Sequence, residues 1–159
     1  RCTSRGLGDV YKRQLVMLLK FLEKIGRKRV IYDRLENEPY LIRYYLFLKD
    51  RKWFPFNIFL HKFMKGDPDE LHDHPWPYAT LILKGGYWEV TPKGKYWRGP
   101  GSFRIAGPKS LHRVELEEGI HAWTLFIPGP KKREWGFIVN GKWMQHEKYF
   151  AWRKEKQNG

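Results

Sequence analysis

The stretch Gly66-Asp-Pro-Asp-Glu-Leu-His72-Asp-His74-Pro-Trp76 places two histidines two positions apart. Side chains alternate between the faces of a β-strand, so His72 and His74 are expected to point the same way. A third histidine, His112, follows a stretch rich in glycine and proline. Imidazole nitrogens bind a metal ion at about 2.0–2.1 Å, which requires that they converge. The pattern therefore predicts one divalent metal ion in a β scaffold, held by His72, His74 and His112.

The rest of the chain has the pattern of a strand-rich domain. Apolar residues at helical spacing run from Leu15 to Ile25, and Gly26 is expected to end that helix. Short runs rich in β-branched and aromatic residues follow, at residues 43–48, 56–64, 78–83, 86–91, 121–127 and 135–139. Asn140-Gly141 is a strong hairpin signal after the last run. Many short strands with regular turn signals favour an all-β barrel or sandwich.

The N-terminal segment has a different origin in our interpretation. Ser4 to Gln14 reads as the in-frame translation of a transposase-type sequencing adapter, so we interpret residues 1–14 as an adapter-derived artefact. Met17 is then a candidate native start, and a trimmed N-terminus is the alternative. The only cysteine, Cys2, lies in this segment, so the remaining chain has no disulfide and no thiolate ligand. Its net charge falls from +14 for the whole chain to about +11.

Composition also limits the compartment and the partners. The apolar run that begins at Leu15 is broken by Lys20 and Glu23, and it is too short to span a bilayer. We therefore expect a cytoplasmic domain with no membrane partner. The basic charge keeps nucleic-acid binding open as an alternative, although no nucleic-acid motif is present. A homodimer also remains open.

The first histidine segment resembles the first motif of the cupin superfamily, the RmlC-like jelly rolls, which reads G-x5-H-x-H-x3or4-E-x6-G. The matching residues are Gly66, His72, His74 and Gly85 or Gly86. Tyr78 or Ala79 stands where the motif has its glutamate.

The second histidine segment resembles the second cupin motif, G-x5-P-x-G-x2-H-x3-N. Gly101 and His112 match, whereas Gly107, Lys109 and Leu116 replace the proline, the second glycine and the asparagine. The resemblance covers about Ile58 to Pro128 and is to a single-domain metal-binding group of the superfamily. It implies a single jelly-roll β-barrel over residues 29–152, with a short N-terminal α-helix over 15–28 and a charged tail over 153–159.

The missing glutamate bears on the chemistry. Three neutral imidazoles leave up to three positions open on an ion, which resembles the three-histidine iron site of thiol dioxygenases. The resemblance implies a mononuclear metal-binding cupin, with a dioxygenase-type oxidoreductase acting on a small anionic organic molecule as the leading hypothesis. Fe(II) is favoured, and Zn, Ni or Cu also suit imidazole ligands. The alternative is a non-catalytic cupin that binds a small ligand or a sugar, or a metal-free isomerase.

Three further residues are candidates for contact with the substrate. Tyr78 has the same strand parity as His72 and His74, and it is expected to orient the ligand. Arg104 and Arg113 flank His112 in sequence, and a guanidinium pairs well with a carboxylate. Either arginine is expected to hold the anion, and the alternative is that both lie on the outer face.

Other polar residues near the motifs keep two interpretations each. His61 and His121 are candidates for a fourth ligand or for a hydrogen-bond donor to a ligand, or they are packed histidines. Glu89 is a displaced carboxylate ligand or an acid/base group, or a solvent-facing strand residue. Asp73 follows His72 directly, so its side chain is expected on the opposite face.

Overall fold

The structure, a computed structural model, describes residues 4–33, 37–50, 53–68 and 70–158, and antiparallel strands make up most of its regular secondary structure. The strands are β1 (Lys28–Tyr32), β2 (Pro39–Tyr45), β3 (Phe59–Phe63), β4 (Tyr78–Lys84), β5 (Tyr87–Thr91), β6 (Gly94–Arg98), β7 (Phe103–Ala106), β8 (Arg113–Glu115), β9 (Ala122–Pro128), β10 (Gly136–Val139) and β11 (Lys142–Gln145). The helices are α1 (Ser4–Lys24) and α2 (His146–Asn158). The all-β fold expected from the strand pattern is confirmed.

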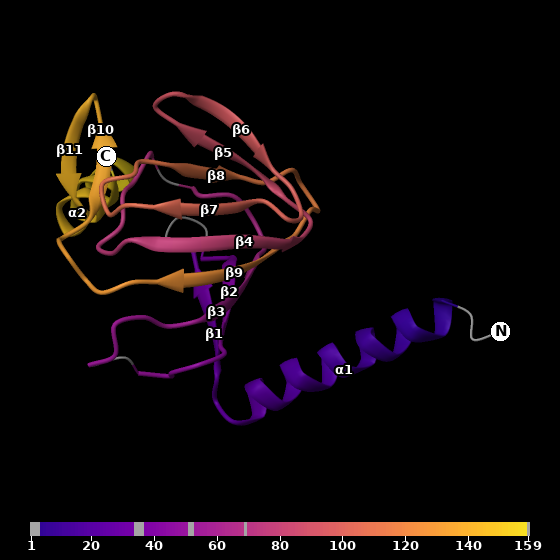
Figure 1. The fold of residues 1–159 in the computed structure, drawn as a ribbon. Coiled ribbons are helices and arrows are strands. Elements are labelled where there is room, and N and C mark those ends of the chain that lie inside the picture. Colours follow the sequence, from indigo (N-terminus) through magenta and orange to yellow (C-terminus); the bar gives the residue numbers. More distant parts are fainter. Residues whose placement is uncertain (1–3, 34–36, 51–52, 69, 159) are drawn as a thin grey trace.

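The strands form two main sheets and a hairpin (Figure 1). The larger sheet has the order β1-β2-β3-β9-β4-β7, and the smaller has the order β6-β5-β8. The hairpin β10-β11 is joined to the smaller sheet through His72, which forms isolated bridges with His112 and Phe137. The segment that carries the His-x-His pattern therefore lies between β10 and the residues just before β8.

Alternating burial defines the interior of the barrel. On β4, Tyr78, Thr80 and Ile82 are buried, whereas the residues between them are partly exposed. Ile82 packs with Tyr87 of β5 and with residues of β8 and β9 in one core cluster. This alternation is the period of a strand with one face toward the core, so the inward positions of each strand can be identified.

Helix α1 projects from the barrel (Figure 1). It begins at Ser4 rather than at the predicted residue 15, so it includes residues 4–14 of the segment interpreted as adapter-derived, and it ends at Lys24 rather than at residue 28. Gly26 ends it as predicted, with φ at 69° and a backbone bond from its N–H to the carbonyl of Glu23. Leu22 packs in a core cluster with residues of β2 and β3, which attaches this end of the helix to the larger sheet.

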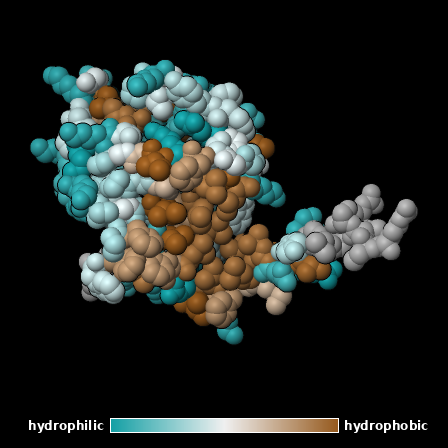
Figure 2. Space-filling model, viewed as in Figure 1, coloured by the Kyte–Doolittle hydropathy of each residue, from teal (hydrophilic) through white to brown (hydrophobic). Residues whose placement is uncertain are grey.

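Hydrophobic side chains gather on one side of the molecule (Figure 2). Exposed examples on the larger sheet are Leu83, Phe103 and Ile105, and those on α1 include Leu18 and Phe21. Neither α1 nor α2, as far as the structure describes them, is long and apolar enough to cross a membrane.

The C-terminal segment differs from the expected charged tail. Residues 153–158 belong to helix α2, whose Tyr149 is fully buried and packs with Phe137 and Val139 of β10. The charged residues that suggested a tail lie on α2. Aromatic residues of the same helix pack against the β10-β11 hairpin. The hairpin turn predicted at Asn140-Gly141 is confirmed, with φ at 50° and 75°.

Candidate metal centre

Three histidines converge at one point of the barrel wall. His72 and His112 are direct antiparallel partners, since the N–H of each donates to the carbonyl of the other at 3.0 and 2.9 Å. Their rings lie 5.0 Å apart between centroids. The Nε2 atoms of His74 and His112 are 2.8 Å apart. One donor atom from each histidine lies within 4.8 Å of the others, so the sequence prediction of a three-histidine cluster is confirmed.

The donor set fits a divalent metal ion. When two imidazole nitrogens each lie about 2.1 Å from one ion and subtend a right angle at it, they are about 3 Å apart. The Nε2 atoms of His74 and His112 lie close to that distance from each other. The Nδ1 atom of His112 lies 3.0 Å from a carboxylate oxygen of Glu89, which fixes the proton on Nδ1. The lone pair of His112 is therefore on Nε2, the atom that faces His74. A carboxylate behind a histidine is the usual support for a metal ligand.

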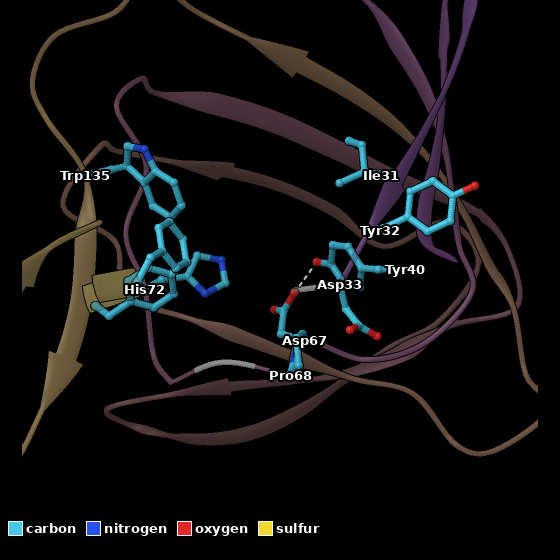
Figure 3. Close-up of a pocket in the computed structure, with 10 residues that line it drawn as sticks. Ile31, Tyr32, Asp33, Tyr40, Asp67, Pro68, His72 and Trp135 are labelled. Atoms are coloured by element: carbon cyan, nitrogen blue, oxygen red, sulfur yellow. Dashed lines mark hydrogen bonds between the residues drawn. The ribbon is translucent and has the colours of Figure 1, made fainter. Parts of the chain in front are cut away.

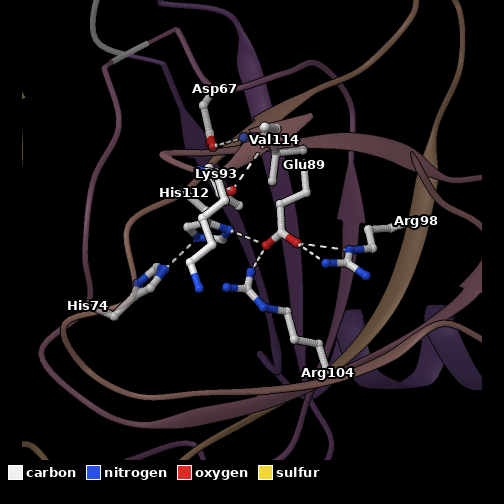
Figure 4. A network of polar contacts seen from close by, with 10 residues as sticks. Asp67, His74, Glu89, Lys93, Arg98, Arg104, His112 and Val114 are labelled. Atoms are coloured by element: carbon white, nitrogen blue, oxygen red, sulfur yellow. Dashed lines mark hydrogen bonds and ion pairs between the residues drawn. The ribbon is translucent and has the colours of Figure 1, made fainter. Parts of the chain in front are cut away.

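Glu89 is the centre of a buried polar network (Figure 4). Only 1% of its surface is exposed, so the interpretation of Glu89 as a solvent-facing residue is wrong. Its carboxylate accepts from Arg98 at 2.8 and 2.9 Å and pairs with Arg104 as well as with His112. Because these three partners occupy the carboxylate, Glu89 positions His112 rather than reaching the other two histidines.

The surroundings keep His74 and His112 neutral. The pKa of His112 is lowered to about 4, mainly by burial, while Asp67 opposes the shift and Arg104 adds to it. Burial also lowers the pKa of His74 well below its ordinary value, with contributions from His112 and His72. Metal ligands must be unprotonated, so both histidines are in the ligand form at neutral pH.

The histidine cluster opens into a cavity of about 350 Å³ inside the barrel. Its wall is largely aromatic, with Phe63, Trp76, Tyr78, Tyr87, Phe126 and Trp135 among the lining residues. A second hollow of about 170 Å³ shares Tyr40, Asp67, His72 and Trp135 with it. In this hollow, His72 and Trp135 lie across from Tyr40 and Asp67 (Figure 3). The cavity has the size and lining of a small-molecule site.

Tyr78 lies beside the cluster. Its ring is 4.8 Å from that of His74 between centroids, and only 4% of the residue is exposed. Burial raises the pKa of its hydroxyl, while the neighbouring Arg104 partly opposes this. The phenol is therefore protonated at neutral pH, and it can donate a hydrogen bond at the cavity wall.

The two arginines that flank the second motif lie on opposite faces. Arg104, on β7, faces inward, opposite Thr80 of β4, and pairs with Glu89. Arg113 lies between the inward-facing His112 and Val114, so it points outward, where it pairs with Glu115. The structure thus brings Arg104 into the network behind the histidines and leaves Arg113 outside the cavity.

The two remaining candidate histidines, His61 and His121, have different surroundings. His61 is 3% exposed, lines the cavity and stacks against both Phe59 and Phe126. Its Nε2 accepts from Nε of Arg43 at 3.0 Å, so that nitrogen is not free to bind a metal. His121 is exposed at the start of β9.

Asp73, between the two histidines of the motif, points away from them as expected. It is 2% exposed and accepts from the N–H of Gly136 at 2.7 Å and from Nε1 of Trp143 at 3.1 Å. It also pairs with Arg133. Asp73 therefore attaches the His-x-His segment to the β10-β11 hairpin.

Sequence reasoning did not identify Arg43 as a cavity residue. It lies on β2 between Leu41 and Tyr45, two residues of the same parity, and it lines the cavity with His61. Because Leu41 is buried, the period of the strand carried the signal that residue 43 faces inward. An arginine at an inward-facing position of β2 was therefore the signal in the sequence that could have identified a charged cavity residue.

Comparison with solved structures identifies the fold as a cupin barrel. A cupin 2 conserved barrel domain protein from Rhodopseudomonas palustris matches with a TM-score of 0.56 and 14% identity, over 82% of this chain and 86% of that chain. The polyketide cyclase RemF from Streptomyces resistomycificus matches with a TM-score of 0.55 and 14% identity, over 70% and 78% of the two chains. A structure of Fe(II)-HppE with an alternative substrate matches with a TM-score of 0.50 and 10% identity, over 65% and 56%.

At these identities the similarity shows the fold alone. The jelly-roll cupin barrel implied by the two histidine motifs is thereby confirmed. No protein-family model and no curated protein sequence matches the chain.

Proposed function

We propose that His72, His74 and His112 bind one divalent metal ion, and that the protein is a dioxygenase-type oxidoreductase for a small anionic organic molecule. The observation that carries this proposal is the convergence of three imidazole donors at the wall of a cavity of about 350 Å³. Fe(II) is the favoured ion, with Zn, Ni or Cu as alternatives. The Fe(II) named for HppE supports the choice because that protein has a related fold.

Each part of the site has a separate task in this proposal. Fe(II) held by three neutral imidazoles would supply open coordination positions and one-electron chemistry. Glu89 fixes the ring orientation of His112. Arg98 and Arg104 pair with the carboxylate of Glu89 and offset its negative charge. Tyr78 donates a hydrogen bond that orients the ligand. The aromatic wall excludes water, which strengthens polar contacts in the cavity.

Metal content tests the proposal. Protein purified from medium supplemented with Fe²⁺, Zn²⁺, Ni²⁺ or Cu²⁺ is analysed by elemental mass spectrometry, and O₂ consumption is then followed with a panel of organic acids. We expect about one ion per chain, and less than about a tenth of that in His72→Ala and His112→Ala. The exposed His121 offers the matched control, since His121→Ala should keep its metal. A wild-type protein without metal in all four media would overturn the proposal.

One observation favours a second candidate, a metal-free isomerase with a histidine base. The Nε2 atoms of His74 and His112 lie at hydrogen-bond distance, so a neutral pair satisfies itself without an ion. Both histidines have lowered pKa values and are unprotonated at neutral pH. Activity that survives complete removal of metal by a chelator would select this candidate.

A further inference from the structure

Arg43 lies inside the barrel on a row of inward-facing residues. It pairs in register with His61 of β3, which pairs in turn with Thr124 of β9. All three residues line the cavity that the metal-binding histidines also line. A cationic side chain therefore lines the same cavity as the proposed metal centre.

The contacts of Arg43 contain no carboxylate among the residues that the structure describes. Its Nε donates to Nε2 of His61 at 3.0 Å, its guanidinium lies 4.6 Å from the ring centroid of Phe59, and the hydroxyl of Tyr45 acts on its pKa from nearby. Burial lowers the pKa of its guanidinium. A partly buried cation without an anionic partner in contact is unfavourable, so an anion in the cavity would relieve that cost.

Other inward or partly buried arginines differ in this respect. Arg98 and Arg104 both pair with Glu89, and Arg133 pairs with Asp73. Each of them therefore has a carboxylate partner within the protein, although Arg98 and Arg104 share one. Arg43 is instead held by a neutral imidazole, which orients the guanidinium but leaves its charge uncompensated.

His61 is suited to hold Arg43 in place. Its ring stacks against both Phe59 and Phe126, at 5.7 and 5.1 Å between centroids. Burial and the charge of Arg43 lower its pKa well below the ordinary value, so it stays neutral and accepts the hydrogen bond. A guanidinium has five N–H donors, and the contacts to His61 and Tyr45 leave others for a ligand.

We propose that Arg43, positioned by His61, binds the carboxylate of a small aromatic monocarboxylate in the cavity. The proposal rests on the proposed function and names its substrate class. One uncompensated guanidinium matches one negative charge, and the carboxylate of Asp67 on the same cavity wall opposes a second. The walls formed by Phe63, Tyr87 and Phe126 match a flat apolar body.

Calorimetric titration of the full-length protein as purified tests this assignment. The probes are benzoate, its neutral counterpart benzyl alcohol and inorganic phosphate. We expect benzoate to bind, with benzyl alcohol and phosphate each at least about tenfold weaker. Absence of benzoate binding, or equal binding of benzyl alcohol, would overturn the assignment of a monocarboxylate as the ligand. Tighter binding of phosphate would overturn it too.

Variants then identify the anchoring residue. Arg43→Gln should weaken benzoate about 10- to 100-fold and leave metal content unchanged. Lys62→Gln is the control, because Lys62 follows the inward-facing His61 on β3 and lies over the ring of Trp123, away from the cavity lining. It removes the same charge outside the cavity, so we expect wild-type affinity. Arg43→Gln with wild-type affinity would overturn the assignment.

Metal measured in the same samples separates this inference from the proposed function. If benzoate binding is lost in His72→Ala but kept in Arg43→Gln, the metal holds the carboxylate and the inference fails. If wild-type protein carries no metal, the proposed function fails, while the comparison of Arg43→Gln with wild type still decides the inference. Circular dichroism and the thermal midpoint show whether Arg43→Gln is folded. If it is not, Arg43→Lys replaces it, because loss of the planar fork should still weaken benzoate.

Discussion

Nδ1 of His112 donates to Oε1 of Glu89 at 3.0 Å. Glu89 lies on β5, and His112 comes just before the neighbouring strand β8. This contact fixes which nitrogen of His112 faces the other two histidines. It also explains why a glutamate is buried in the barrel without being placed to bind the ion itself. The site is thus three imidazoles with a carboxylate behind one of them.

Glu89→Gln should weaken metal binding and destabilise the fold. Loss of a carboxylate behind a ligand typically lowers metal affinity about 10- to 100-fold, and removal of one partner of a buried ion pair costs about 3 kcal/mol. Competition with a chromogenic chelator and urea unfolding measure the two effects. Glu115→Gln removes a partly exposed partner of Arg113, and it should cost less than about 1 kcal/mol. Equal losses in the two variants would contradict a special role for Glu89.

The stability of the metal-free protein should fall as pH falls from about 6.5 to about 4. Burial lowers the pKa of His112 to about 4 in the folded protein, whereas an unfolded histidine titrates near about 6.5. Between these values the unfolded state binds more protons, so the loss reaches about 3 kcal/mol. Urea unfolding from pH 4 to 7 measures it. His112→Gln should show a shallower slope, with His74 supplying the remainder, and an unchanged slope would exclude His112 as its source.

Asp73→Asn should loosen the His-x-His segment from the β10-β11 hairpin. The change leaves Arg133 without its carboxylate and weakens the bond to the N–H of Gly136, so we expect a loss of about 2 kcal/mol. Metal affinity should fall with it, because His72 and His74 flank this anchor. Glu134→Gln is the control, because Glu134 forms an exposed ion pair with Lys131. It should leave the free energy of unfolding and the metal affinity unchanged. Retention of full metal affinity by Asp73→Asn would show that the anchor does not position the histidines.

Gly85→Ala should be much more damaging than Gly101→Ala. Both glycines have positive φ, at 73° and 84°, where an alanine costs about 1 kcal/mol. A Cβ at Gly85 would also lie 2.1 Å from the carbonyl oxygen of His121, whereas Gly101 has open space. Thermal unfolding of the two variants measures the difference. Similar midpoints would show that the backbone at Gly85 shifts without cost.

Local sequence signals predicted the features that depend on nearby residues. The i, i+2 spacing predicted that His72 and His74 point the same way, although only His72 forms isolated bridges and neither lies in a strand. Gly26 ended the helix, and Asn140-Gly141 formed its hairpin turn. In each case a few neighbouring residues determine the geometry, because side-chain direction and φ are local properties. The order of the two motifs then indicated that His112 would join the pair.

The features that join distant strands could not be predicted in the same way. Glu89 was recognised as sharing a face with Tyr87, but the alternation of β5 does not say which face is inside. The aromatic side of α2 became evident only where Tyr149 packs against Phe137. These outcomes depend on which strands become neighbours, which is a property of the whole barrel.

By itself, the sequence of this protein determined a strand-rich chain whose three histidines could share one ion. Only the tertiary structure decided that Arg104 faces Glu89, that Arg113 faces outward and that Arg43 faces the cavity without a carboxylate. The physical reason is that residue type and spacing set which groups can interact. The compensation of a charge depends on the groups that the fold brings next to it.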